Sequence, residues 1–282
     1  MATAARTDPT TGGADATGPL RAGEVARYRM AGYVTPRLRL PADALARLAA
    51  AVDALIEANP QVRPEDLAVP HVPGGAGGRL NTPAALRAEF LAIGRHPLLL
   101  EAVAQLIGPD IILWSSHAFC KPAATGATVP WHQDGQYWPI RPMATCTAWI
   151  AIDRSDRGNG CLRVIPGSHR DGLLSHRRDG DKALALDSVL DLSSLDAETA
   201  EDVVLEPGAV SFHDVHLVHG SEPNRSDRPR RAMVFRYMPA TSHYDRDTPD
   251  YVMGNGVVMH WASRPIWLVR GRNRHPGNSV EA

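Results

Sequence analysis

The sequence predicts a mainly β fold with flanking helices. After Gly108 the chain consists of a series of short apolar or β-branched runs, and turn residues separate one run from the next. No helical pattern alternates with these runs. This arrangement favours an antiparallel sandwich or barrel over a sheet built from βαβ units.

Helical patterns occupy the first third of the chain. Pro41 suits the first turn of a helix, and apolar residues then recur at helical spacing as far as Asn59. The Pro- and Gly-rich stretch at residues 69–81 predicts a loop, and residues 83–107 carry two shorter helical patterns. Residues 1–22 contain almost nothing large to bury, so we expect a disordered tail there.

The strand-like runs lie at about residues 110–240, which we expect to form the core of one domain over residues 23–272. The remaining residues, 273–282, are expected to be a C-terminal tail. Residues 170–202 separate two strand candidates and are too many for a hairpin turn. Because long connections in compact domains are often functional, we predict that this segment is a lid.

Composition and charge point to a protein that acts on small molecules. The chain has 30 Lys and Arg residues against 31 Asp and Glu residues, so no global field would attract nucleic acid or an anionic membrane. Its three cysteines form no C-x-x-C pair, and no signal segment or long apolar run is visible. We therefore expect a cytoplasmic monomer or homodimer with neither nucleic acid nor membrane as partner.

The stretch WHQDGQYW holds the first candidate ligands, His132 and Asp134. On a strand, residues two apart point to the same face, so an imidazole and a carboxylate would project together. Such a pair can share a divalent metal, although a hydrogen-bonded pair would produce the same pattern. A metal site needs a third ligand.

Three histidines in the stretch SFHDVHLVHGSEPNRSDRPRRAM are candidates for the third ligand: His213, His216 and His219. Two His and one carboxylate leave three coordination positions open, as in non-haem Fe(II) oxygenases. His219 fits best because it ends an apolar run just before a turn, whereas the other two also fit as hydrogen-bonded strand residues. A hairpin across that turn would place Arg230 beside His219, where a guanidinium can clamp a carboxylate.

The chain resembles the phytanoyl-CoA dioxygenase family of Fe(II)/2-oxoglutarate oxygenases, which includes ectoine hydroxylases. Three segments carry the resemblance: WHQDGQYWPIRP, TAWIAIDRSDRGNGCLRVIPGSH and EPGAVSFHDVHLVHGSEPNRS, followed by an arginine. It extends over about residues 121–238. The fold that it implies is a double-stranded β-helix, a jelly-roll or cupin-like barrel.

The resemblance also implies roles for individual residues. The implied metal ligands are His132, Asp134 and His219. The implied contacts of 2-oxoglutarate are Arg230, or Arg231 if the register differs by one, with Ser221, Trp149 and His117. As candidates for the wall of the substrate pocket we take Tyr137 and Trp138, which follow the H-x-D pair, and His176 from the lid.

The resemblance implies a hydroxylation, or another oxidation, of an unactivated C–H bond of a small organic molecule. Fe(II), 2-oxoglutarate and O2 would be used, and succinate and CO2 released. Related halogenases lack the carboxylate ligand, so the presence of Asp134 argues against chlorination. Two alternatives remain: a zinc hydrolase with a His2Asp site, which leaves Arg230 unexplained, and a non-catalytic cupin-like ligand-binding barrel.

Overall fold

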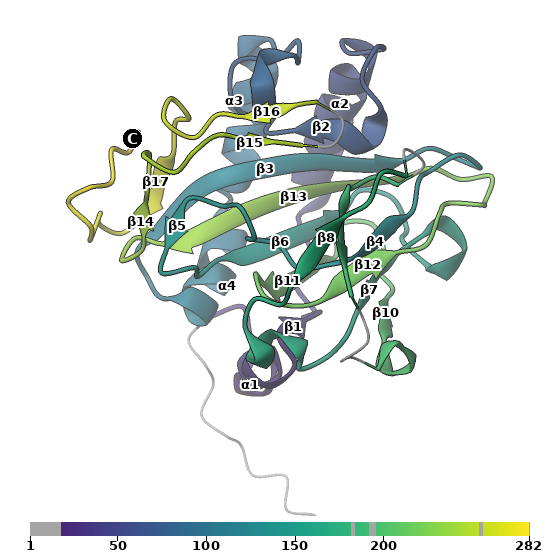
Figure 1. The fold of residues 1–282 in the computed structure, drawn as a ribbon. Coiled ribbons are helices and arrows are strands. Elements are labelled where there is room, and N and C mark those ends of the chain that lie inside the picture. The colour runs from purple at the N-terminus through teal and green to yellow at the C-terminus, as the bar shows by residue number, and fades with distance from the viewer. Residues whose placement is uncertain (1–17, 182–183, 192–195, 254–255, 282) are drawn as a thin grey trace, which may run out of the picture.

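Two facing antiparallel sheets and a layer of helices make up the fold (Figure 1). The computed structural model describes residues 18–181, 184–191, 196–253 and 256–281. The expected mainly β architecture with flanking helices is confirmed, and its two sheets remain open at their edges instead of closing into a barrel.

The larger sheet has the order β1-β11-β6-β13-β3-β17, and β2 pairs with the C-terminal part of β3. The smaller sheet has the order β10-β7-β12-β4. The strands of the larger sheet are β1 (Tyr33–Val34), β2 (Leu67–Ala68), β3 (Ile111–Lys121), β6 (Cys146–Ala151), β11 (Val210–Asp214), β13 (Arg230–Pro239) and β17 (Trp267–Arg270). Those of the smaller sheet are β4 (Val129–His132), β7 (Leu162–Val164), β10 (Glu201–Val203) and β12 (His219–Ser221).

Three two-stranded pairs and several short 3₁₀ helices complete the strand region. The pairs are β5 (Ile140–Arg141) with β14 (His243–Tyr244), β8 (His176–Arg178) with β9 (Ser188–Leu190), and β15 (Tyr251–Val252) with β16 (Val258–Met259). The 3₁₀ helices are η1 (Pro64–Asp66), η2 (Ala76–Gly78), η3 (Arg157–Asn159), η4 (Ser168–Asp171) and η6 (Ala197–Thr199).

The chain passes repeatedly between the two sheets, which corrects one expectation. We expected a hairpin from His219 to Arg230, but β12 belongs to the smaller sheet and β13 to the larger one. The turn after β12 therefore crosses the sandwich. His219 and Arg230 face a common interior from opposite sheets, instead of lying side by side in one.

Helices lie on the outer face of the larger sheet, and one of them, α1, lies beside the edge strand β1 (Figure 1). Their bounds are α1 (Ala22–Ala31), α2 (Ala42–Glu57), α3 (Ala84–Gly94) and α4 (Pro97–Ile107), so α2, α3 and α4 lie where the sequence predicts them. A glycine ends α3 because that helix approaches the sheet closely. A Cβ on Gly94 would lie 2.9 Å from Leu113 and 3.0 Å from Phe235.

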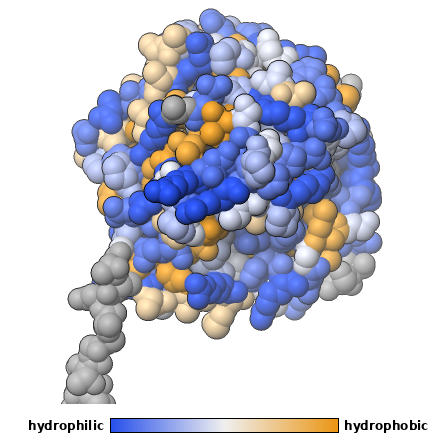
Figure 2. Space-filling view, turned by 90° about the vertical axis from the view of Figure 1, so that its left-hand side faces the viewer, coloured by the Kyte–Doolittle hydropathy of each residue, from blue (hydrophilic) through white to orange (hydrophobic). Residues whose placement is uncertain are grey.

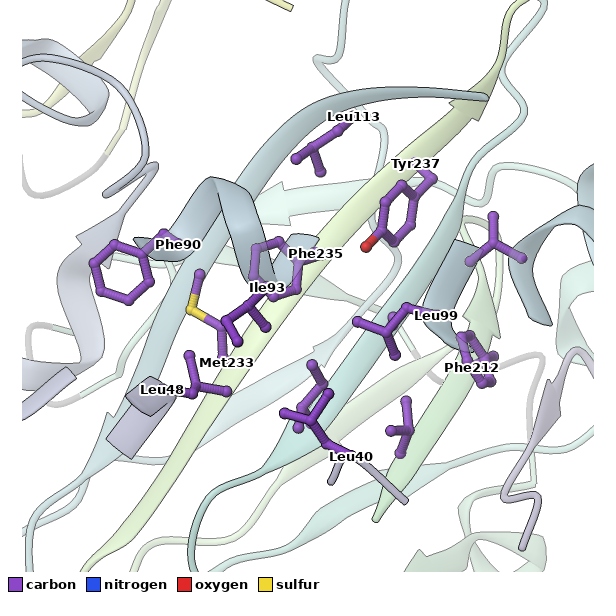
Figure 3. Close-up of a cluster of buried hydrophobic side chains, with 14 of the residues drawn as sticks. Leu40, Leu48, Phe90, Ile93, Leu99, Leu113, Phe212, Met233, Phe235 and Tyr237 are labelled. Carbon is purple, nitrogen blue, oxygen red and sulfur yellow. The ribbon is translucent and has the colours of Figure 1, made fainter. Parts of the chain in front are cut away.

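The strand β13 separates two environments. Its side chains Met233, Phe235 and Tyr237 are fully buried and pack against the helices, as Figure 3 shows. Because side chains alternate along a strand, the opposite face of β13 points to the space between the sheets. Arg230 and Arg236 lie on that inner face.

The folded region extends beyond the boundaries expected from the sequence. Leu20 is buried, and both its amide and its carbonyl bond to the side chain of Gln105, at 2.9 Å each. Near the other end, Asn278 is buried and accepts a hydrogen bond from the amide of Tyr244. The rest of the predicted N-terminal tail, residues 1–17, lies outside the described residues.

Described parts of the predicted lid lie over the space between the sheets. The pair β8 and β9 belongs to this segment, and β9 packs beside β4. Asp187 and Ser188 line the cavity described below. That the segment opens and closes stays a prediction.

Hydrophilic residues cover most of the face at the end of the molecule that carries β5, β14 and β17, with smaller hydrophobic patches between them (Figure 2). In the described part of the chain no single helix has the length and apolar composition needed to cross a membrane. Only α3 and α4 taken together pass such a test, and they are bent by 51° relative to each other.

We predict that Phe235→Ala lowers the free energy of unfolding by about 3–5 kcal/mol, because it opens a cavity between β13 and the helices. Leu173→Ala, at a residue that is 50% exposed, should change it by less than about 0.5 kcal/mol. Chemical denaturation of the purified variants measures both values. A loss below about 1 kcal/mol for Phe235→Ala would contradict the described packing.

Candidate metal centre

The structure brings the three predicted ligands together. His132 ends β4 and His219 begins β12, and the two residues are direct antiparallel partners whose ring centroids lie 4.2 Å apart. One potential ligand atom from each of His132, His219 and Asp134 lies within 4.8 Å of the others. Among the described residues this is the group of His, Cys, Asp and Glu side chains that could hold a metal ion.

Asp134 reaches this group from a turn, not from a strand. We expected His132 and Asp134 on one continuous strand, but β4 ends at His132 and the chain turns at Asp134. Gly135 has a φ of 88°, a conformation that favours glycine, and a Cβ on it would lie 2.7 Å from Val215. The glycine thus permits the turn that directs the carboxylate back to the two imidazoles.

Hydrogen bonds set the orientation of both imidazoles. His132 Nδ1 lies 2.9 Å from the carbonyl of Pro130, and His219 Nδ1 lies 2.8 Å from that of Leu217. Since a carbonyl only accepts, each Nδ1 donates and each Nε2 keeps its lone pair for a metal. Burial lowers the pKa of His132 to about 3 and also lowers that of His219, so both rings are neutral at physiological pH.

Asp134 is an ionised carboxylate. Burial raises its pKa, but the guanidinium of Arg236 outweighs that effect and leaves the pKa below its usual value. Arg236 Nε lies 3.4 Å from Asp134 Oδ2. Two neutral imidazoles and one buried carboxylate form a donor set that fits Fe(II) with open coordination positions.

The two other histidines do not join this group. His213 on β11 is buried with its ring centroid 5.0 Å from that of His219, and its Nδ1 has no hydrogen-bond partner among the described residues. His216 lies 3.5 Å from Asp214 and is partly exposed. The choice of His219 as third ligand stays a prediction, and the ligand-atom geometry favours it.

Arg230 lies at the wall of the same cavity and is nearly inaccessible, with 2% exposure. Its Nη1 donates to the carbonyl of Phe119 at 3.2 Å, and its guanidinium lies over the Trp149 ring at 5.4 Å. Its Nε has no hydrogen-bond partner within the described ranges. Burial lowers its pKa to about 10, so Arg230 is still charged at pH 7, and no carboxylate of the described residues forms an ion pair with it.

Arg231, the alternative from the sequence, points to the other face of β13. It forms ion pairs with Asp153 at 2.8 Å and Asp53 at 2.5 Å, and these pairs raise its pKa. Its guanidinium is therefore already neutralised by this chain. Of the two arginines, Arg230 alone faces the cavity.

The other residues predicted to contact 2-oxoglutarate also line the cavity, namely Ser221, Trp149 and His117. His117 Nε2 lies 2.8 Å from the carbonyl of Glu65, and burial lowers the His117 pKa to about 4. This ring is therefore a neutral donor to the backbone. Its role toward a cosubstrate stays a prediction.

Of the predicted substrate-pocket residues, Tyr137 and Trp138 line the cavity and His176 does not. The ring of His176 lies behind the wall, where its Nε2 accepts from the amide of Gln133 and its Nδ1 donates to the carbonyl of Leu174, both at 2.9 Å. Both ring nitrogens are used. His176 thus joins the lid segment to the turn that carries Asp134.

The family model of phytanoyl-CoA dioxygenase (PhyH) matches residues 28–232. The chain belongs to the phytanoyl-CoA dioxygenase family. It is 29% identical over 194 residues to the peroxisomal phytanoyl-CoA dioxygenase of Bos taurus, which covers 62% of this chain and 57% of that protein. The chain is also 30% identical over 148 residues to a probable alpha-ketoglutarate-dependent hypophosphite dioxygenase of Stutzerimonas stutzeri. That match covers 52% of this chain and 51% of the dioxygenase.

Among solved structures, the apo form of the non-heme monooxygenase ThoJ superposes with a TM-score of 0.66 and 26% identity, over 88% of this chain and 84% of ThoJ. The double-stranded β-helix fold expected from the sequence is thereby confirmed. The chain spans about half the length of the curated relatives it matches.

The residue that our reasoning from the sequence missed in this family member is Arg236. It lines the cavity and pairs with Asp134, yet no motif includes it. The signal was the period of two along β13, since Arg236 lies an even number of positions after Arg230 and so on the same face of the strand. That signal becomes usable only once β13 is known to remain regular between them.

We predict that Ala substitution of His132, Asp134 or His219 weakens Mn(II) binding by more than roughly a hundredfold, because losing a hydrogen-bond partner behind a ligand already costs ten- to a hundredfold. Electron paramagnetic resonance of free Mn(II) measures the affinity. His216→Ala is the control and should bind like wild type. If His219→Ala bound Mn(II) like wild type while His213→Ala lost Mn(II) binding, His213 and not His219 would be the third metal ligand.

Proposed function

We propose that the chain is an Fe(II)- and 2-oxoglutarate-dependent dioxygenase that hydroxylates, or otherwise oxidises, an unactivated C–H bond of a small organic molecule. The observation that carries this proposal is the buried, charged guanidinium of Arg230, which has no carboxylate partner among the described residues and lines the same cavity as three side chains that could hold a metal. Family membership supports the same reaction class.

A buried charge is costly unless a counter-charge meets it. The far carboxylate of 2-oxoglutarate supplies that charge, and the free Nε of Arg230 provides a donor for it. A zinc hydrolase would need the three ligands but would leave Arg230 unpaired, and a binding barrel would need no set of open coordination positions. The combination therefore favours a 2-oxoglutarate enzyme over both alternatives.

Fe(II), 2-oxoglutarate and O2, when bound, supply the oxidation and yield succinate and CO2. The chain itself would bind and orient the metal and 2-oxoglutarate. His132, Asp134 and His219 would hold the metal through two neutral nitrogens and one carboxylate. Arg230 and Ser221 would hold the far carboxylate.

Aromatic side chains form much of the rest of the wall. Trp149 is 5% exposed and lies against the Arg230 guanidinium, which shields that charge from water. Tyr137 and Trp138 form part of the space left for substrate. Exclusion of water strengthens each electrostatic contact inside the site.

Related proteins are enzymes that act on small molecules, and we propose that this chain also acts on a small molecule. We also propose that it works in the cytoplasm as a monomer or homodimer, without nucleic acid or membrane as partner. Three free, buried thiols support a reducing compartment: Cys120, Cys146 and Cys161. The nearly balanced charge supports the absence of a polyanionic partner.

We predict that Arg230→Ala leaves Mn(II) binding intact but weakens 2-oxoglutarate by roughly thirty- to a thousandfold, the loss of a partly desolvated charge-assisted pair. The 2-oxoglutarate affinity of Arg230→Lys should lie between those of wild type and Arg230→Ala, because lysine restores the charge but not the two parallel hydrogen bonds. Anaerobic titration of the Fe(II) protein, followed by the metal-to-ligand charge-transfer band, measures the affinity. Succinate release measures turnover.

Arg231→Ala is the matched control on the opposite face of β13 and should retain the 2-oxoglutarate affinity of wild type. If Arg231→Ala abolished the band while Arg230→Ala kept it, the assignment of the arginine would be wrong. If neither substitution had an effect, the proposed cosubstrate would be wrong as well.

A further inference from the structure

A second guanidinium, that of Arg236, faces the cavity and has no role in the function proposed above. It lies on the inner face of β13, as Arg230 does, but close to Asp134 and to the aromatic wall. Its side chain is 16% exposed, and its plane lies over the Trp138 ring at 5.2 Å. It is thus held in place by Trp138 and Asp134.

Most of the hydrogen-bonding capacity of Arg236 is unused. Among the described residues its one hydrogen bond runs from Nε to Asp134 Oδ2, at a long 3.4 Å. A guanidinium carries five N–H donors, and its two terminal nitrogens form a fork that matches a carboxylate. Since both are without a protein partner in the described ranges, they are available to a molecule in the cavity.

Charged side chains of both signs line the cavity. Arg230 and Arg236 are positive, and Asp134 and Asp187 are negative. Asp187 lies 4.0 Å from Arg178, which is outside the lining, so it does not occupy Arg236. Among the described residues Arg236 is paired only through its Nε, with Asp134, and its terminal nitrogens match an anionic group of a molecule in the cavity.

The wall near Arg236 indicates what accompanies that anionic group. Tyr137 lines the cavity, and Tyr251, which is outside the lining, stacks on it with a centroid distance of 3.8 Å and an interplanar angle of 5°. Trp138 meets Trp114 edge to face at 4.5 Å. Such aromatic surfaces pack well against an apolar or aromatic body.

We propose that Arg236 binds an anionic group of the substrate, and that the substrate is a small apolar or aromatic acid whose carboxylate pairs with the terminal nitrogens of Arg236. This inference rests on the proposed function, because it assigns the space beside the metal to the substrate. The carboxylate would hold the reacting carbon close to Asp134 and thus to the metal.

The test compares acids with their neutral amides in the absence of turnover. Wild type, Arg236→Gln and Arg236→Lys are loaded with Mn(II) and saturating 2-oxoglutarate without O2, so that Arg230 is already occupied. Benzoate, phenylacetate and 3-phenylpropanoate, each paired with its amide, are titrated while tryptophan fluorescence is followed. Trp138 lies against Arg236 and reports binding there.

Wild type should bind at least one acid roughly ten- to a hundredfold more tightly than its amide, the value of a charge-assisted pair. Arg236→Gln should bind acid and amide alike, with amide affinity unchanged, and Arg236→Lys should regain part of the preference. Arg231→Gln, on the opposite face of the strand, should behave like wild type. Thermal unfolding verifies that each variant is folded.

Three results would overturn the proposal. The first is a wild type that prefers no acid, or that binds none. The second is an Arg236→Gln variant that keeps the full preference for acids. The third is an Arg236→Gln variant that loses 2-oxoglutarate or Mn(II) while the acid preference persists, which would make Arg236 a positioning residue for the cosubstrate or for Asp134. The 2-oxoglutarate titration of wild type reports on the proposed function alone. A failure of the proposed function is therefore distinguishable from a failure of the inference about Arg236.

Discussion

A buried positive charge that the described residues leave without a counter-charge is the constraint on which the site depends. Arg230 is almost fully enclosed, and the described residues give it a backbone carbonyl and aromatic faces but no carboxylate. Taking a charge out of water is unfavourable unless a ligand restores the lost interactions. The fold therefore carries a cost that binding of a carboxylate relieves, which couples occupancy of the site to stability.

The sandwich allows this placement because its two sheets contribute different parts. The smaller sheet carries His132 and His219, and the larger sheet carries both cavity arginines on one face of β13. The other face of β13 is packed against helices, so the strand cannot shift without exposing Phe235 or Tyr237. Helix packing thus fixes where the charges stand relative to the metal ligands.

Much of this site could be predicted from the sequence, because residue types with few alternatives define it. His132, Asp134, His219 and Arg230 are all found in the cavity. The errors concern how the chain arrives there. The glycine turn and the crossing between sheets depend on tertiary contacts, and local pattern favours a straight strand and a hairpin. The cavity position of Arg236 likewise depends on the strand register, which no single stretch of sequence fixes.

A crystal structure of the anaerobic protein with Mn(II) and 2-oxoglutarate tests the central claim most directly. The account predicts the metal on Nε2 of His132, Nε2 of His219 and the Asp134 carboxylate, and the far carboxylate of 2-oxoglutarate on the guanidinium of Arg230 at about 2.7–3.0 Å. A metal bound elsewhere, or a far carboxylate paired with Arg236 while Arg230 stays alone, would contradict it.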